Sequence, residues 1–140
     1  MNKMIEKLYF EILDWFSNTK IFNHMMSRKD IRMNIWHNCS HILTFWSLLL
    51  YFNDNEYENK MNYYIEKINL NKIDLCEHEK SELVKFALIN DLELYKVENI
   101  YDKLKHFESY HNITDDNKYK EICIYMSNNL DFLINKILNI

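Results

Sequence analysis

Two histidines, His37 and His41, have a spacing that could support metal chemistry. Four residues apart on a helix, their imidazoles lie on one face, where two rings can ligate the same ion. The other close pair, His106 and His111, is five residues apart. The extra residue rotates the second side chain by about 100° away from the position it would have at a spacing of four. No glutamate lies one turn from His37 or His41 to complete a carboxylate site. A metal-binding helical bundle using His37 and His41 is therefore an alternative, and polar-face or capping roles are favoured, with no cofactor expected.

Arg32 precedes His37 by five residues. This pattern resembles the RxxxxH motif of HEPN-type ribonucleases, in which the two side chains act on ribose and phosphate. Met33 stands where a polar residue would follow the arginine in that motif. The net charge is −4 and no basic stripe runs along the chain, so a nucleic-acid partner is not expected. A HEPN-like ribonuclease using Arg32 and His37 stays an alternative.

The three cysteines, Cys39, Cys76 and Cys123, are far apart and form no CxxC motif. This usage fits a reducing compartment, so we expect a cytoplasmic location. Cys39 lies between His37 and His41, but residues two apart on a helix point in different directions. We therefore expect Cys39 in the core rather than in a Cys–His pair. No catalytic constellation emerges, and the chain is not expected to be an enzyme.

Glycine and proline are both absent. Without glycine, phosphate-binding loops and dinucleotide fingerprints are excluded, and tight hairpins are disfavoured. Without proline, nothing interrupts a helix. We therefore expect an all-α, compact single-domain bundle of six to seven helices over residues 1–140. Apolar periodicity predicts helices at 3–22, 28–52, 56–68, 78–95, 97–110 and 117–138, with a polar connection at 69–76. In the last helix, residues three and four apart form an inward apolar seam: Tyr119, Ile122, Met126, Leu130, Leu133 and Ile137.

Local signals refine these bounds. Ser27, with Asp30 three residues on, imitates a capping box at the start of helix 28–52. Residues 53–55 predict a turn and a cap for the next helix. Residues 42–52 are apolar nearly all round, which is typical of a central helix. This run is shorter than the ~18–20 residues that a membrane span needs.

Aromatic residues make up 15% of the chain, with three Trp, ten Tyr and eight Phe. A domain of this size does not easily bury all of them, and exposed aromatic area on a helical domain usually marks a protein partner. We expect a groove between helices 28–52 and 78–95. Its predicted lining is Phe45, Trp46, Leu50, Tyr51, Leu83 and Phe86.

The order of features resembles the poxvirus Bcl-2-like proteins. The stretch 10–15 is similar to their Tyr-Ile-x-Trp start, 48–54 to an apolar helix ending in an acidic turn, and 64–68 to a short following helix. The stretch 112–116 is similar to the Asn-Ile-Thr-Asp turn before their long last helix. The resemblance implies a non-enzymatic viral inhibitor in the host cytoplasm. Such proteins bind a host signalling or apoptosis protein and thereby block NF-κB activation, interferon induction or apoptosis. Several self-associate through their first and sixth helices, so the resemblance also allows a homodimer.

Overall fold

A computed structural model describes residues 14, 23, 27–94 and 116–139. The predicted helices 3–22 and 97–110 fall almost entirely outside these residues, so the count of six to seven helices and the single domain over 1–140 stay predictions. The all-α class is confirmed for the described residues, which contain no strand. Their elements are α3 (Lys29–Phe52), α4 (Asn55–Lys67), a 3-10 turn η1 (Leu70–Lys72), α5 (Glu77–Leu94), α7 (Asp116–Asn128) and α8 (Leu130–Leu138).

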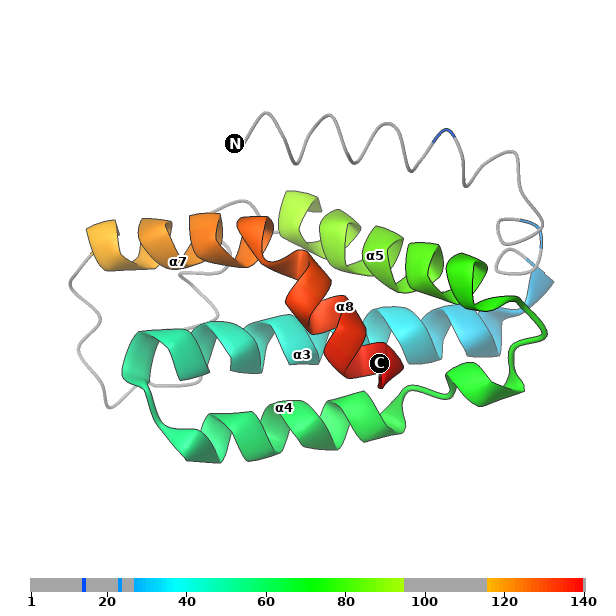
Figure 1. The fold of residues 1–140 in the computed structure, drawn as a ribbon, viewed down its shortest axis with the longest axis horizontal. Coiled ribbons are helices and arrows are strands. Elements are labelled where there is room, and N and C mark those ends of the chain that lie inside the picture. The colour runs from blue at the N-terminus through cyan, green and yellow to red at the C-terminus, as the bar shows by residue number, and fades with distance from the viewer. Residues whose placement is uncertain (1–13, 15–22, 24–26, 95–115, 140) are drawn as a thin grey trace.

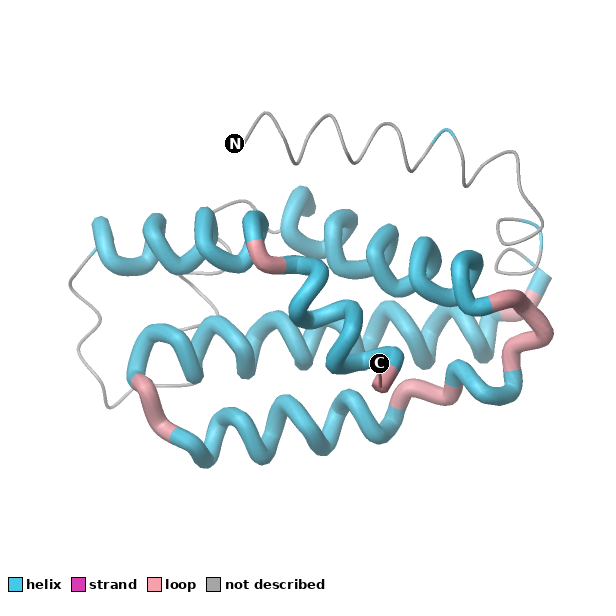
Figure 2. The backbone as a smooth tube through the Cα atoms, viewed as in Figure 1, coloured by secondary structure: helices cyan, strands magenta, loops and turns pink. Residues whose placement is uncertain are grey.

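The longest of the described helices, α3, is the centre of the arrangement and contacts α4, α5 and α7. It forms an antiparallel hairpin with α4, and α5 returns along its other side (Figure 1). α8 crosses in front of α3 and contacts both α5 and α4. The connections around α4 and η1 are short (Figure 2). The described helices therefore enclose one shared core.

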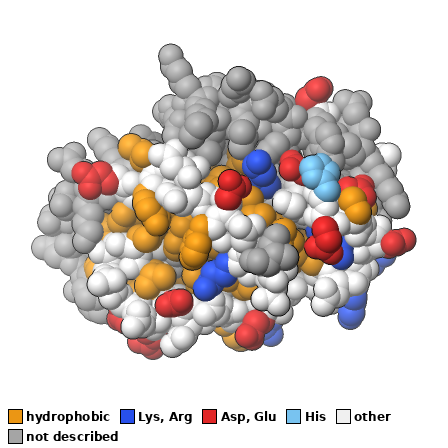
Figure 3. Space-filling model, in the orientation of Figure 1, with side chains coloured by type: hydrophobic (Ala, Val, Ile, Leu, Met, Phe, Trp, Pro, Cys, Tyr) orange, Lys and Arg blue, Asp and Glu red, His pale blue; other side chains and the backbone are white. Residues whose placement is uncertain are grey.

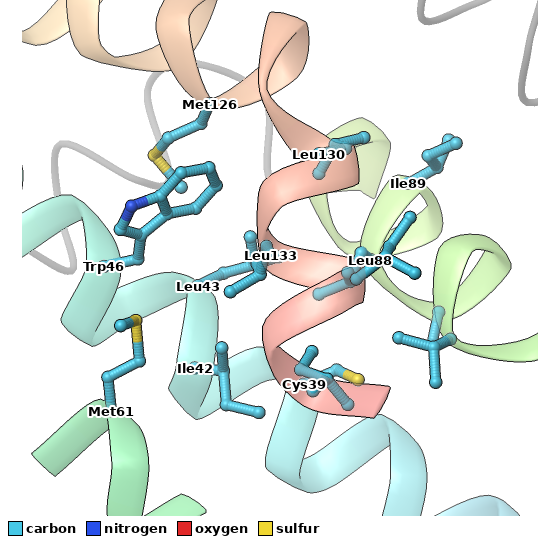
Figure 4. Close-up of a cluster of buried hydrophobic side chains, with 14 of the residues drawn as sticks. Cys39, Ile42, Leu43, Trp46, Met61, Leu88, Ile89, Met126, Leu130 and Leu133 are labelled. Carbon is cyan, nitrogen blue, oxygen red and sulfur yellow. The ribbon is translucent and has the colours of Figure 1, made fainter. Parts of the chain in front are cut away.

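The core is built around the apolar half of α3. Residues 42–48 are all buried, which confirms the prediction that this stretch is central. Leu133 of α8 lies between Leu43 of α3 and Leu88 of α5 (Figure 4). The small Ala87 is also buried on α5, where its size allows close helix approach. Side chains from α3, α4, α5, α7 and α8 all contribute to this single cluster.

The start of α3 differs from the prediction. Its N-cap is Arg28 rather than Ser27, and Arg28 makes no side-chain capping hydrogen bond. Asp30 instead accepts two hydrogen bonds from the Arg28 guanidinium, at 3.0 and 2.7 Å. These hydrogen bonds lower the pKa of Asp30 to about 2. Asp30 thus remains a carboxylate in the first turn, where the helix dipole favours negative charge.

The predicted turn between α3 and α4 is confirmed. Asn53 takes a left-handed conformation with φ of 53°, and its N–H donates to the Leu49 carbonyl at 2.8 Å. Asparagine tolerates this region better than most residues, which suits a chain without glycine. The Asp54 carboxylate then accepts from the Glu56 N–H at 3.0 Å and caps α4.

The prediction of one unbroken helix over 117–138 is wrong, because the helix breaks at Asn129. The side-chain amide of Asn129 donates to the Tyr125 carbonyl at 2.8 Å, while its backbone N–H donates to Met126 at 3.3 Å. The side chain thus takes the acceptor that a continuous helix would give to the backbone. The predicted inward positions still hold on both sides of the break, with Ile122, Met126, Leu130, Leu133 and Ile137 all buried.

Asn34 joins α3 to the end of α4. Its amide nitrogen donates to the Lys67 carbonyl at 3.0 Å, and its amide oxygen accepts from the Asn69 N–H at 3.2 Å. One side chain therefore pairs a backbone acceptor and a backbone donor where α4 ends. Asn34 thereby fixes the position at which the chain leaves the α3–α4 hairpin.

We expect Asn34→Asp to lower the free energy of unfolding by about 1–2 kcal/mol, because a carboxylate cannot donate to the Lys67 carbonyl. Urea denaturation followed by circular dichroism measures this loss. Asn59→Asp is the matched control, since Asn59 is exposed on α4. Equal effects of the two substitutions would contradict the role assigned to Asn34.

Candidate functional site

The residues predicted to line a groove lie mostly in the core. Leu50 is half-buried, and the other five are buried in this structure: Phe45, Trp46, Tyr51, Leu83 and Phe86. The two helices that carry them are in contact, as expected. Their burial gives these side chains a packing role in the described structure. Binding of a partner by them stays a prediction.

Two exposed aromatic side chains, Tyr125 and Phe132, contact the buried Trp46. Trp46 is only 2% exposed, and its ring centroid lies 6.3 Å from that of Tyr125 and 6.2 Å from that of Phe132. Tyr125 is 49% exposed and Phe132 56% exposed. Ile124, next to Tyr125 on α7, is 54% exposed. We call Ile124, Tyr125 and Phe132 the α7–α8 apolar surface.

The break at Asn129 contributes to the shape of this surface. Tyr125 lies in the last turn of α7 and Phe132 in the first turn of α8, so the two rings approach Trp46 from different helices. The buried Met126 side chain also reaches toward the Trp46 indole (Figure 4). A thioether against an aromatic ring is a favourable contact. The two exposed rings therefore rest on a buried support.

Polar groups surround the α7–α8 apolar surface. Glu121 and Asp131 are exposed on the same two helices, and Lys136 of α8 lies 3.7 Å from Glu58 of α4. Hydrophobic side chains gather on the face that holds α7 and α8, with charged groups among and around them (Figure 3). An apolar centre with a polar rim is the usual anatomy of a protein interface.

The three residues of the α7–α8 apolar surface are not among the predicted groove residues. The predicted inward seam of helix 117–138 is confirmed at five positions, whereas the side chain of Tyr119 lies outside the described ones. The five buried positions are Ile122, Met126, Leu130, Leu133 and Ile137. Ile124, Tyr125 and Phe132 fall outside the seam and must point elsewhere. Helical periodicity therefore predicts that these three side chains point away from the core. It does not show that the Tyr125 and Phe132 rings both contact Trp46.

His37 and His41 are neighbours, as their spacing predicted. Their ring centroids lie 4.6 Å apart at an interplanar angle of 77°. His41 also stacks on Tyr64 of α4, with centroids 4.4 Å apart and planes 13° from parallel. Within 27–94 and 116–139, no group of three or more His, Cys, Asp or Glu side chains could hold a metal ion. His106 and His111 lie outside the described residues.

Arg32 and His37, the pair similar to the ribonuclease motif, both lie on α3. Arg32 is half-buried and His37 is exposed. Five residues on an α-helix correspond to a rotation of about 140°, so the two side chains leave α3 in different directions. A ribonuclease role for them stays a prediction.

The cysteines differ in their environments. Burial, together with the nearby Asp91 carboxylate, raises the pKa of the Cys39 thiol well above its ordinary value. Burial also raises the pKa of Cys123 to about 11. Because the thiolate is the reactive form, both groups are unreactive near neutral pH. Cys39 therefore serves the core, as expected, and Cys76 is the exposed cysteine.

Comparisons with protein-family models, with curated proteins and with solved structures find no match. In the part of the chain that the structure describes, no helix combines the length and apolar character needed to cross a membrane.

Proposed function

We propose that this chain is a non-enzymatic protein-interaction domain that uses the α7–α8 apolar surface to hold a partner protein. The observation that supports it best is the pair of half-exposed rings, Tyr125 and Phe132, resting on the buried Trp46. Two large apolar groups in contact with water are unfavourable unless another surface covers them.

The packing beneath these rings favours binding. Aromatic anchors near the centre of an interface contribute much of its affinity, above all where they are already fixed before binding. The contacts with Trp46 hold Tyr125 and Phe132 in place from below, so little side-chain freedom is lost when a partner covers them. Tyr125 also brings a hydroxyl group that can pair at the edge of the contact.

The proposal also includes the kind of protein that is bound. The resemblance to poxvirus Bcl-2-like proteins supports a cytoplasmic host protein of innate-immune signalling or apoptosis, and hence a viral inhibitor that acts by sequestration. A Bcl-2-like arrangement of six to seven helices is part of the same proposal. The predicted groove from Phe45 to Phe86 would act mainly as the support of the contact, because its side chains are buried.

Co-purification from host-cell lysate, followed by mass spectrometry and a binding titration with the protein recovered, tests the proposal. We expect the double variant Tyr125→Ser/Phe132→Ser to bind that protein at least about 30-fold more weakly, which corresponds to roughly 2 kcal/mol for the loss of an anchor. Met33→Ser is the matched control, because Met33 is equally exposed, at 56%, on α3. Circular dichroism would verify that both variants are folded.

Two results would overturn the proposal. One is a partner that binds the double variant as tightly as the native chain. The other is an equal loss of binding in Met33→Ser, which would show that the effect is not particular to the α7–α8 apolar surface.

A further inference from the structure

We infer that His37 and His41 form a two-imidazole site on α3 for a late first-row divalent metal ion, with Cu²⁺ bound more tightly than Ni²⁺ or Zn²⁺. The site is separate from the α7–α8 apolar surface and does not depend on the proposed function. It rests on the positions of three rings: His37, His41 and Tyr64.

The distance between the two imidazoles suits shared coordination. A nitrogen–metal bond of about 2.1 Å places a ring centroid about 3.2 Å from the ion, so two rings about 90° apart at the ion have centroids about 4.5 Å apart. The observed separation between His37 and His41 is 4.6 Å. Adjacent positions of a square-planar or octahedral ion fit this value, whereas a tetrahedral angle would require about 5.2 Å.

Tyr64 holds the imidazole of His41 in position. It stacks on the face of His41 with planes 13° from parallel, and imidazole binds metals through nitrogens that lie in the ring plane. The stack therefore restrains the orientation of the His41 ring, and it occupies a face of that ring rather than the plane in which the nitrogens bind metals. Coordination takes one nitrogen, and the other can keep a hydrogen bond, as is usual for metal-ligating histidines. His37 is exposed, so its ring has room to turn its nitrogen toward the same ion.

The donor set determines the class of ion. Two neutral imidazoles without a carboxylate favour copper, nickel and zinc over magnesium and calcium, which prefer oxygen. The order of affinity among divalent ions of this kind places Cu²⁺ first. Because no larger ligand group occurs among the described residues, water fills the other positions of the ion.

Equilibrium dialysis of the full chain against CuCl₂, with all variants in a Cys76→Ser background, tests the site at pH 7.5. Removing this exposed thiol prevents it from binding or oxidising with copper. We expect His37→Gln and His41→Gln each to lower the affinity of one Cu²⁺ ion at least tenfold. His78→Gln is the matched control, because His78 is exposed on α5, and it should leave the affinity unchanged.

Electron paramagnetic resonance of the copper-loaded chain provides a second readout, since it counts the nitrogens around the ion. We expect two imidazole nitrogens in the parent chain and fewer in either variant. Unchanged copper affinity in His37→Gln or in His41→Gln would overturn the inference. An equal loss in His78→Gln would overturn it too.

Discussion

Replacing Trp46 by alanine is expected to lower the free energy of unfolding by about 3–5 kcal/mol. The indole is 2% exposed in the central helix, and it contacts rings on both α7 and α8. Its removal leaves a cavity that the surrounding helices can fill only in part. The substitution therefore removes apolar burial and weakens the attachment of the last two helices to α3.

Chemical denaturation followed by circular dichroism measures this loss without relying on tryptophan fluorescence. Trp46→Phe is the natural control, since it retains an aromatic ring and leaves a smaller cavity, and it should cost clearly less. A Trp46→Ala chain that unfolds at the same denaturant concentration as the native chain would show that Trp46 does not support the core.

A second large effect is expected for Leu133→Ala, which should cost about 2–5 kcal/mol. Leu133 is fully buried on α8 and lies between Leu43 of α3 and Leu88 of α5 (Figure 4). The neighbouring residue, Phe132, is 56% exposed. Phe132→Ala removes more atoms but less buried area, so it should cost about 1 kcal/mol or less.

The comparison of these two neighbours tests the orientation of α8 directly. Both substitutions are measured by the same urea titration, and the smaller side chain should give the larger loss. If Phe132→Ala proves as costly as Leu133→Ala, then Phe132 is buried in solution, and the α7–α8 apolar surface does not exist as described.

Much of the fold could be predicted from residue types. The absence of glycine and proline predicted helices, and apolar spacing gave the bounds of α3, α4 and α5 to within two residues. Asn53 and Asp54 were identified as turn and cap because asparagine tolerates the left-handed region and aspartate accepts N–H groups. These are local effects, and a single sequence contains them.

Other features depend on side-chain hydrogen bonds that compete with the backbone hydrogen bonds of a helix, and apolar periodicity does not reveal these. The inward seam continues through Asn129, so its spacing predicted one helix, and only the hydrogen bond from the Asn129 side chain to Tyr125 explains the break. Ser27 looked like a cap, yet the Arg28–Asp30 pairing determines how α3 begins. In both cases a side chain changed the local hydrogen bonding at the end of a helix.

In the candidate sites too, contacts within one helix could be predicted from spacing, whereas contacts between helices could not. The proximity of His37 and His41 follows from helical spacing alone, and the structure confirms it. The stacking on Tyr64 requires α4 to lie against α3, which the sequence does not state. The meeting of Tyr125 and Phe132 at Trp46 likewise depends on three helices that come together only in the fold.

Site-specific photo-crosslinking in host cells tests the central claim most directly. A benzophenone side chain placed at position 132 should give a covalent adduct with a partner protein, because Phe132 is an exposed residue of the proposed contact. The same group at position 33, which is equally exposed on α3, should give none. Adducts from both positions alike, or no adduct from position 132, would contradict the assignment of the α7–α8 apolar surface as the place where a partner binds.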